Sequence, residues 1–296
     1  MQFNDQKKGT LMAFAAVMFL TPDSVLIRLA DISSWNLIFY RGFIPFSAVF
    51  IGLLFFYKTN LIKQTISNSW HGIAYALIFA ATNIAFVTSI ENTNVANTLI
   101  MIALAPMLSA VLSFIFLKEI PDKKTWVAIS ITTLSVIYIF YDAMDTGEML
   151  GNAMGLITAC GLAVGAVIIR SAKKIDLVPS AMFGKLLVAL IAFYYADDLL
   201  LRNFGNNFFN LKNDMLLIPI MCIMCVAVPF VLVTIAPRYI TAAEVNLFFL
   251  LETILGPLWV WMVIKEEPSI ETIIGGFVII FTIAVHSFLS LKKSTI

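Results

Sequence analysis

Ten runs of about twenty apolar residues constrain this chain more than any other feature of its sequence. They lie at 9–30, 34–57, 70–90, 94–117, 125–141, 150–170, 180–201, 216–235, 241–264 and 270–290. A helix of that length spans the hydrocarbon core of a bilayer. Because 60% of the residues are hydrophobic and only 12% are charged, lipid must be the solvent for most of the chain. Lipid permits only helices or closed barrels, and these runs are too long for barrel strands. The sequence therefore predicts an all-α integral membrane protein with ten transmembrane helices.

The positions of lysine and arginine predict how these helices are oriented. If both termini are cytoplasmic, the cytoplasmic side holds thirteen basic residues: Lys7, Lys8, Lys58, Lys63, Lys118, Lys123, Lys124, Arg170, Lys173, Lys174, Arg238, Lys292 and Lys293. The outer side then holds three, Arg202, Lys212 and Lys265. Cytoplasmic loops of membrane proteins carry an excess of basic residues. We therefore expect a multi-pass protein of the cytoplasmic (inner) membrane with both termini in the cytoplasm, the first run being a retained span rather than a signal peptide.

The chain also repeats itself. Its fourth span ends in Phe116–Pro121 and its ninth in Val263–Pro268, and both segments carry Lys-Glu-x-Pro. At similar offsets Arg28 matches Arg170, and Arg41 matches Lys185. These matches predict two halves, 1–146 and 147–296, each of five helices. Because five is odd, the second half enters the membrane from the opposite side, as in transporters whose substrate binds between inverted repeats. A duplicated scaffold without a transport role is the alternative.

Several of these segments carry a family resemblance. They are Pro22–Ser24, Phe39–Gly42, Ala105–Pro106, Phe116–Glu119, Leu251–Thr253, Gly256–Pro257 and Lys265–Glu266. The chain resembles the ten-helix, EamA-type members of the drug/metabolite transporter superfamily over nearly its whole length. One departure is Thr253, where the family pattern often has proline. The resemblance implies an inverted 5+5 bundle with a central cavity that moves small metabolites such as amino acids, purines or sugar derivatives.

Residues Thr21, Pro22 and Asp23 form a helix start signal in the middle of the first span. They supply a capping hydroxyl, a first-turn proline and an acid that faces the helix dipole. The sequence therefore predicts that the first span breaks at Pro22 and restarts at membrane depth, beside a transport pathway. A proline kink whose backbone groups are satisfied by neighbouring residues is the alternative.

Asp23 and Arg41 are expected to form an ion pair. Each lies about seven residues, or about 10 Å, from the outer end of its span, and a short turn makes the two helices neighbours. The pair fits equally well a pin between two helices and a wall of the substrate cavity. Arg28 lies closer to the outer boundary, where its side chain could extend to the interface instead of serving transport.

Lys185 and Asn83 are further candidates for the cavity. Lys185 is the counterpart of Arg41 in the second half and could meet a substrate carboxylate or phosphate, or extend to the cytoplasmic interface. Asn83 offers hydrogen-bonding groups that line a cavity or join two helices.

Glu252 is the deepest acid, about eleven residues into the ninth span. Without a permanent partner it would suit a proton carrier, whereas a hydrogen bond to a facing helix would make it structural. Trp259 follows on the same helical face and is a candidate cavity wall. Glu244 and Asn246 begin the same span and are candidates on the cytoplasmic side, where Glu244 could also be a cap.

No pattern indicates a cofactor, a metal site or a nucleic-acid partner. Cys222 and Cys225 have metal-like spacing without a second pair, so we interpret them as packing residues, as we do Gly161 and Gly165. Histidine clusters and nucleotide-binding loops are missing, which argues against an enzyme and a pump driven by ATP. The favoured function is a secondary active transporter of small polar metabolites such as amino acids or related organic ions, coupled to protons or not. A facilitative exchanger or uniporter is the alternative, and a channel a remote one.

Overall fold

The computed structural model describes residues 3–57, 68–118, 123–146, 148–172, 175–197, 199, 214–236, 239 and 242–294, and this part of the chain is helical without strands. Its elements are α1 (Phe3–Leu20), α2 (Asp23–Leu29), α3 (Ser34–Tyr57), α5 (Ser69–Asn92), α6 (Val95–Ile102), α7 (Ala105–Leu117), α8 (Lys123–Thr146), α9 (Met149–Ser171), α10 (Val178–Tyr195), α11 (Asp214–Ile220), the π-helical η2 (Met221–Ala227), α12 (Val228–Ile235), α13 (Ala242–Ile264) and α14 (Ile270–Ser294).

The all-helical transmembrane prediction is confirmed. Within the described residues, seven helical stretches are long and apolar enough to cross a membrane, and three shorter apolar helices fall on the remaining predicted spans. The first, fourth and eighth spans are each interrupted, giving α1–α2, α6–α7 and α11–η2–α12. A proline lies at or next to each interruption, namely Pro22, Pro106, and Pro219 with Pro229. Proline has no backbone N–H, so it removes one hydrogen bond of the helix and favours such breaks.

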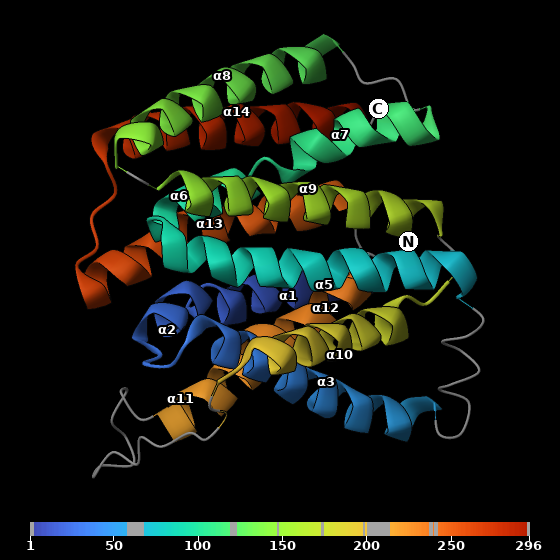
Figure 1. The fold of residues 1–296 in the computed structure, drawn as a ribbon. Coiled ribbons are helices and arrows are strands. Elements are labelled where there is room, and N and C mark those ends of the chain that lie inside the picture. The colour runs from blue at the N-terminus through green and yellow to red at the C-terminus, as the bar shows by residue number, and fades with distance from the viewer. Residues whose placement is uncertain are drawn as a thin grey trace.

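The helices lie side by side along one common direction, and the start of α1 and the end of α14 lie at the same end of the bundle (Figure 1). Equivalent spans of the two halves pack on each other: α3 on α10, α6 on α13, and α8 on α14. The contact between α5 and α9 likewise has its counterpart in the contact between α12 and α1. This pairing is what two structurally related halves produce.

The second half is inverted relative to the first. Glu148, directly before α9, accepts a hydrogen bond from Thr93, whose carbonyl oxygen accepts one from Arg28 near the end of α2. The sixth span therefore begins at the end of the bundle where the first span finishes. The backbone repeats as well, since Lys118 and Lys265 are the two non-glycine residues with positive φ in the described chain, at 57° and 64°. Both follow the last turn of a helix, where a left-handed residue commonly ends it.

Glycines allow the closest helix contacts. A Cβ on Gly42 would lie 2.6 Å from the backbone nitrogen of Ala189 and 2.8 Å from the carbonyl oxygen of Lys185, so α3 and α10 touch through their backbones. This contact brings Lys185 next to the helix that carries Arg41. On α9, Gly161 faces Thr82 and Gly165 faces Tyr75, both on α5. The interpretation of these two glycines as packing residues is confirmed.

Candidate functional site

The break in the first span lies where the sequence predicts it. Helix α1 ends at Leu20 and α2 begins at Asp23. Because Pro22 cannot donate a hydrogen bond, the carbonyl oxygen of Met18 accepts one from the Thr21 hydroxyl at 3.2 Å instead. The expected capping role of this hydroxyl is wrong, since Pro22 occupies the cap position of α2 and no side chain caps it. The Thr21 hydroxyl therefore bonds to a carbonyl oxygen of α1, before the break, and caps no backbone group of α2.

Asp23 and Arg41 form the predicted ion pair. Both guanidinium nitrogens donate to the carboxylate, Nη1 to Oδ1 at 2.6 Å and Nη2 to Oδ2 at 2.7 Å. The residues are only 1% and 5% exposed, and the ring of Phe86 lies 5.7 Å from the guanidinium carbon. Such bidentate pairs are geometrically specific and strong for hydrogen bonds. Asp23 is thus neutralised inside the bundle by a cation of the neighbouring helix.

Lys185 lies beside this pair without an acid of its own. Its ammonium donates to Oδ1 of Asn83 and lies 5.4 Å from the ring of Phe79, and the residue is 2% exposed. The charges of Arg41 and Asp23 both act on it, while no carboxylate among the described residues lies within ion-pair distance. The side chain does not extend to the interface, so the alternative of an interfacial lysine does not fit. Asn83 donates to the carbonyl oxygen of Phe79, which turns its own oxygen towards Lys185.

Glu252 is the complementary case, an acid without a base. It lies on α13, is 8% exposed, and makes no hydrogen bond or ion pair with any described residue. The charge that acts on it is that of Asp23, another acid. The structure therefore brings Lys185 of α10 and Glu252 of α13 to the same Asp23–Arg41 pair. We call these four side chains, together with Asn83, the central polar cluster.

Trp259 joins the second half of the chain to the break in the first. Its indole nitrogen donates to the hydroxyl of Thr21 at 3.3 Å. Trp259 itself is 38% exposed, whereas Thr21 is 1% exposed. Its role as a cavity wall stays a prediction. The backbone of Glu244 and Asn246 lies in the first turns of α13, and their side chains lie outside the described part of the structure.

The π-helical segment η2 is a feature of the site that the sequence analysis missed. It packs against α1, α2 and α3, and its buried Cys222 lies within electrostatic range of Asp23, Arg41 and Lys185. Short π-helical segments are frequent at functional sites. The two flanking prolines were the available signal. The described residues include no group of acids, cysteines and histidines that could hold a metal ion, and both Cys222 and Cys225 are buried packing residues.

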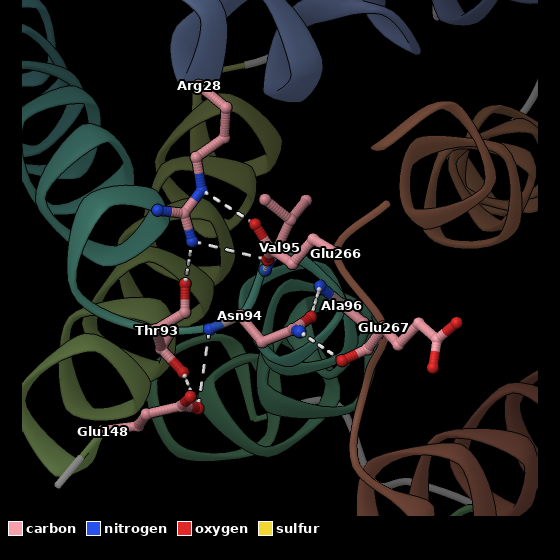
Figure 2. A network of polar contacts seen from close by, with 8 residues as sticks. All are labelled: Arg28, Thr93, Asn94, Val95, Ala96, Glu148, Glu266 and Glu267. Atoms are coloured by element: carbon pink, nitrogen blue, oxygen red, sulfur yellow. Dashed lines mark hydrogen bonds and ion pairs between the residues drawn. The ribbon is translucent and has the colours of Figure 1, made fainter. Parts of the chain in front are cut away.

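Glu91 was missed as well, because the predicted third span stops at residue 90 while α5 continues to Asn92. Its carboxylate accepts a hydrogen bond from Ser34 and lies in the field of Arg28 and Arg41. Arg28 in turn belongs to a second polar network, at the end of the bundle that holds the α2–α3, α5–α6 and α13–α14 connections (Figure 2). Glu91 therefore interacts electrostatically with one residue of each group, Arg28 of that network and Arg41 of the central polar cluster.

Comparison with known proteins gives a family and a fold. The family model of EamA-like transporters matches residues 7–141 and again residues 149–288, once in each half of the chain. One solved crystal structure superposes with a TM-score of 0.64 at 16% sequence identity, covering 97% of this chain and 99% of the other. No curated protein sequence matches significantly. At this identity the structural match concerns the fold alone.

Proposed function

The chain belongs to the EamA-like transporter family, and from this premise we propose that it carries small organic ions, such as amino acids, across the cytoplasmic membrane by alternating access. Membership of the family makes it a membrane transporter of small molecules. The observation that supports the narrower proposal is the unpaired charges of the central polar cluster. Lys185 has no acid and Glu252 no base among the described residues, although both are buried.

An ionisable side chain at membrane depth costs about 2.5–3.5 kcal/mol on insertion scales, so a protein that keeps one there has a use for it. Asp23 and Arg41 neutralise each other, which leaves Lys185 and Glu252 to interact with the substrate and with a proton. We assign the substrate's carboxylate or phosphate to Lys185, whose orientation is fixed by Asn83. We assign proton exchange to Glu252, because a buried acid without a cationic partner can take up and release a proton as its surroundings change.

The test begins with metabolite profiling of cells with and without the protein, followed by uptake of the candidate compounds into proteoliposomes. We expect uptake to accelerate when a proton gradient is imposed. In Glu252→Gln, uptake should lose its dependence on pH while exchange of substrate for substrate persists. Lys185→Gln should abolish binding of the substrate, and Lys118→Gln, outside the cluster, should not.

Uptake by Glu252→Gln that stays pH-dependent would contradict the proton-carrier role. Wild-type uptake that ignores every ion gradient would favour the alternative, a facilitative exchanger or uniporter. A single-file current far above the rate of a conformational cycle would indicate a channel.

A further inference from the structure

Arg28, in the last turn of α2, holds two parts of the chain at once. Its Nη2 donates to the carbonyl oxygen of Thr93 at 2.7 Å and to Oε1 of Glu266 at 3.4 Å (Figure 2). Its Nε also lies 3.3 Å from Oε2 of Glu266. Thr93 belongs to the α5–α6 turn of the first half, and Glu266 to the α13–α14 connection of the second. One guanidinium of α2 therefore joins two chain connections at this end of the bundle.

Glu266 also binds the start of α6. Its Oε1 accepts a hydrogen bond from the backbone nitrogen of Val95 at 2.9 Å, one of the free N–H groups at a helix N-terminus (Figure 2). The neighbouring Asn94 caps α6 through the backbone nitrogen of Ala96 and donates to the carbonyl oxygen of Glu267 at 3.1 Å. The carboxylate of Glu266 thus has two partners, a cation and a helix N-terminus, both in the first half of the chain.

The α5–α6 turn is bound from its other side too. Oε2 of Glu148 accepts hydrogen bonds from Thr93 at 2.8 Å and from Asn97 at 3.1 Å. The oxygen of the Asn97 amide accepts a further bond from Thr272 of α14. Residues of the second half therefore enclose the first-half turn on two sides.

This network lies between the end of the bundle and the central polar cluster. Arg28 is five residues further along α2 than Asp23, about 7.5 Å nearer the end. Helices α2 and α13 pack on each other, and deeper along the same contact Trp259 bonds to Thr21. Separation of α2 from α13 at this end therefore requires the Arg28–Glu266 pair to break.

We propose that Arg28 and Glu266 form a latch that keeps this end of the transporter closed, and that access from this side opens when their ion pair breaks. The proposal rests on the proposed function, since a latch implies a pathway behind it. The exposure of the two groups suits this role. The side chains of Arg28 and Glu266 are 26% and 21% exposed, whereas those of Arg41 and Asp23 are 6% and 1% exposed. A partly hydrated ion pair is weak and separates readily, whereas breaking a buried one leaves a charge uncompensated.

The latch can be tested by measuring the distance between the two connections that it joins. Spin labels are attached at Ser33→Cys, in the α2–α3 turn, and Ile270→Cys, at the start of α14, after the three native cysteines are replaced by serine. Double electron–electron resonance then gives the distribution of distances between the two labels in the purified protein. We expect Glu266→Gln, which keeps an oxygen for the Val95 N–H but loses the charge, to shift part of the distribution to longer distances. Arg28→Ala should shift it further, because the bond to Thr93 is lost as well.

Two further variants separate a latch from general damage. Glu267→Gln removes the charge of a neighbouring carboxylate that accepts a hydrogen bond from Trp261, and it should leave the distances unchanged. The exchange Arg28→Glu with Glu266→Arg restores the ion pair but not the bonds to the Thr93 carbonyl oxygen and the Val95 N–H. Compared with Arg28→Glu alone, it should return part of the distribution to the short distance, which a misfolded protein would not do. Distances that are identical in wild type, Glu266→Gln and Arg28→Ala would overturn the latch. The measurement needs no substrate, so a protein that fails to transport would refute the proposed function and leave this result intact.

Discussion

Charged residues inside this bundle divide by the partners they have. Asp23 and Arg41 satisfy each other with two hydrogen bonds and are buried, so neither is free to follow a substrate or proton. Lys185 is oriented by a neutral amide, and Glu252 has no partner among the described residues. From this difference we propose a separation of roles at the residue scale: the first pair fixes the site, and the other two interact with the substrate and the proton.

The Asp23–Arg41 pair predicts a specific pattern of stability. Asp23→Asn and Arg41→Gln should each lower the free energy of unfolding by about 3–5 kcal/mol, because each leaves a buried charge uncompensated. The double variant, with neither charge, should recover most of that loss. Thermal unfolding of the purified protein in detergent measures the effect. Equal losses that simply add in the double variant would show that the two residues act independently.

At the scale of helices, the interrupted first and eighth spans both contribute to the candidate site. The break at Pro22 allows the Thr21 hydroxyl to bond to Met18 and to receive the Trp259 indole, which couples α13 to the first span. The π-helical η2 packs against both parts of that span, α1 and α2. Irregular backbone at membrane depth is tolerated where it is buried in protein or lines a cavity. Here the break at Pro22 directly precedes Asp23, and η2 packs on the helices that carry Asp23 and Arg41.

Pro22→Ala should close the break in the first span. Alanine supplies the missing N–H, which can bond to the Met18 carbonyl oxygen and displace the Thr21 hydroxyl. We expect an unfolding temperature at or above that of the wild type and a several-fold slower uptake in proteoliposomes. Pro257→Ala, within the continuous helix α13, is the matched control and should affect uptake less. Unchanged uptake in Pro22→Ala would show that the break has no part in transport.

The whole molecule is organised by its inverted repeat. Equivalent helices pack on each other, and the two left-handed lysines end equivalent helices. The boundary between the halves, set at 146 and 147 from the sequence, stays a prediction. In transporters built from an inverted repeat, rocking of one half against the other exposes a site between them to alternate sides. Under the proposed function, the network around Arg28 lies at one of the two ends where the halves would separate.

The orientation in the membrane is also still a prediction, and single cysteines test it. In a background without native cysteines, Ser33→Cys should react with a membrane-impermeant thiol reagent added to intact cells. Ser171→Cys, exposed at the end of α9, should react only after the cells are opened. The expectation follows from the thirteen basic residues assigned to the cytoplasmic side. The reverse pattern would place both termini outside.

The sequence by itself determined the class of the protein, the ten spans, the repeat and the break at Pro22. These features depend on local properties: the length and hydrophobicity of each run, the missing N–H of proline, and motifs that recur in both halves. The Asp23–Arg41 pair could be predicted because one short turn joins two spans whose lengths fix the depth of each residue.

Only the tertiary structure decided which partners meet across the halves. Lys185 and Asn83 are 102 residues apart, and Arg28 and Glu266 are 238 apart. Nothing local specifies such contacts, because they depend on the angles at which helices cross and on where glycines such as Gly42 let them approach. The π-helical segment is a further example, since proline signals a disturbance of the helix but not the number of residues in the turn. The packing of the whole bundle fixes both the contacts across the halves and the form of the π-helical segment.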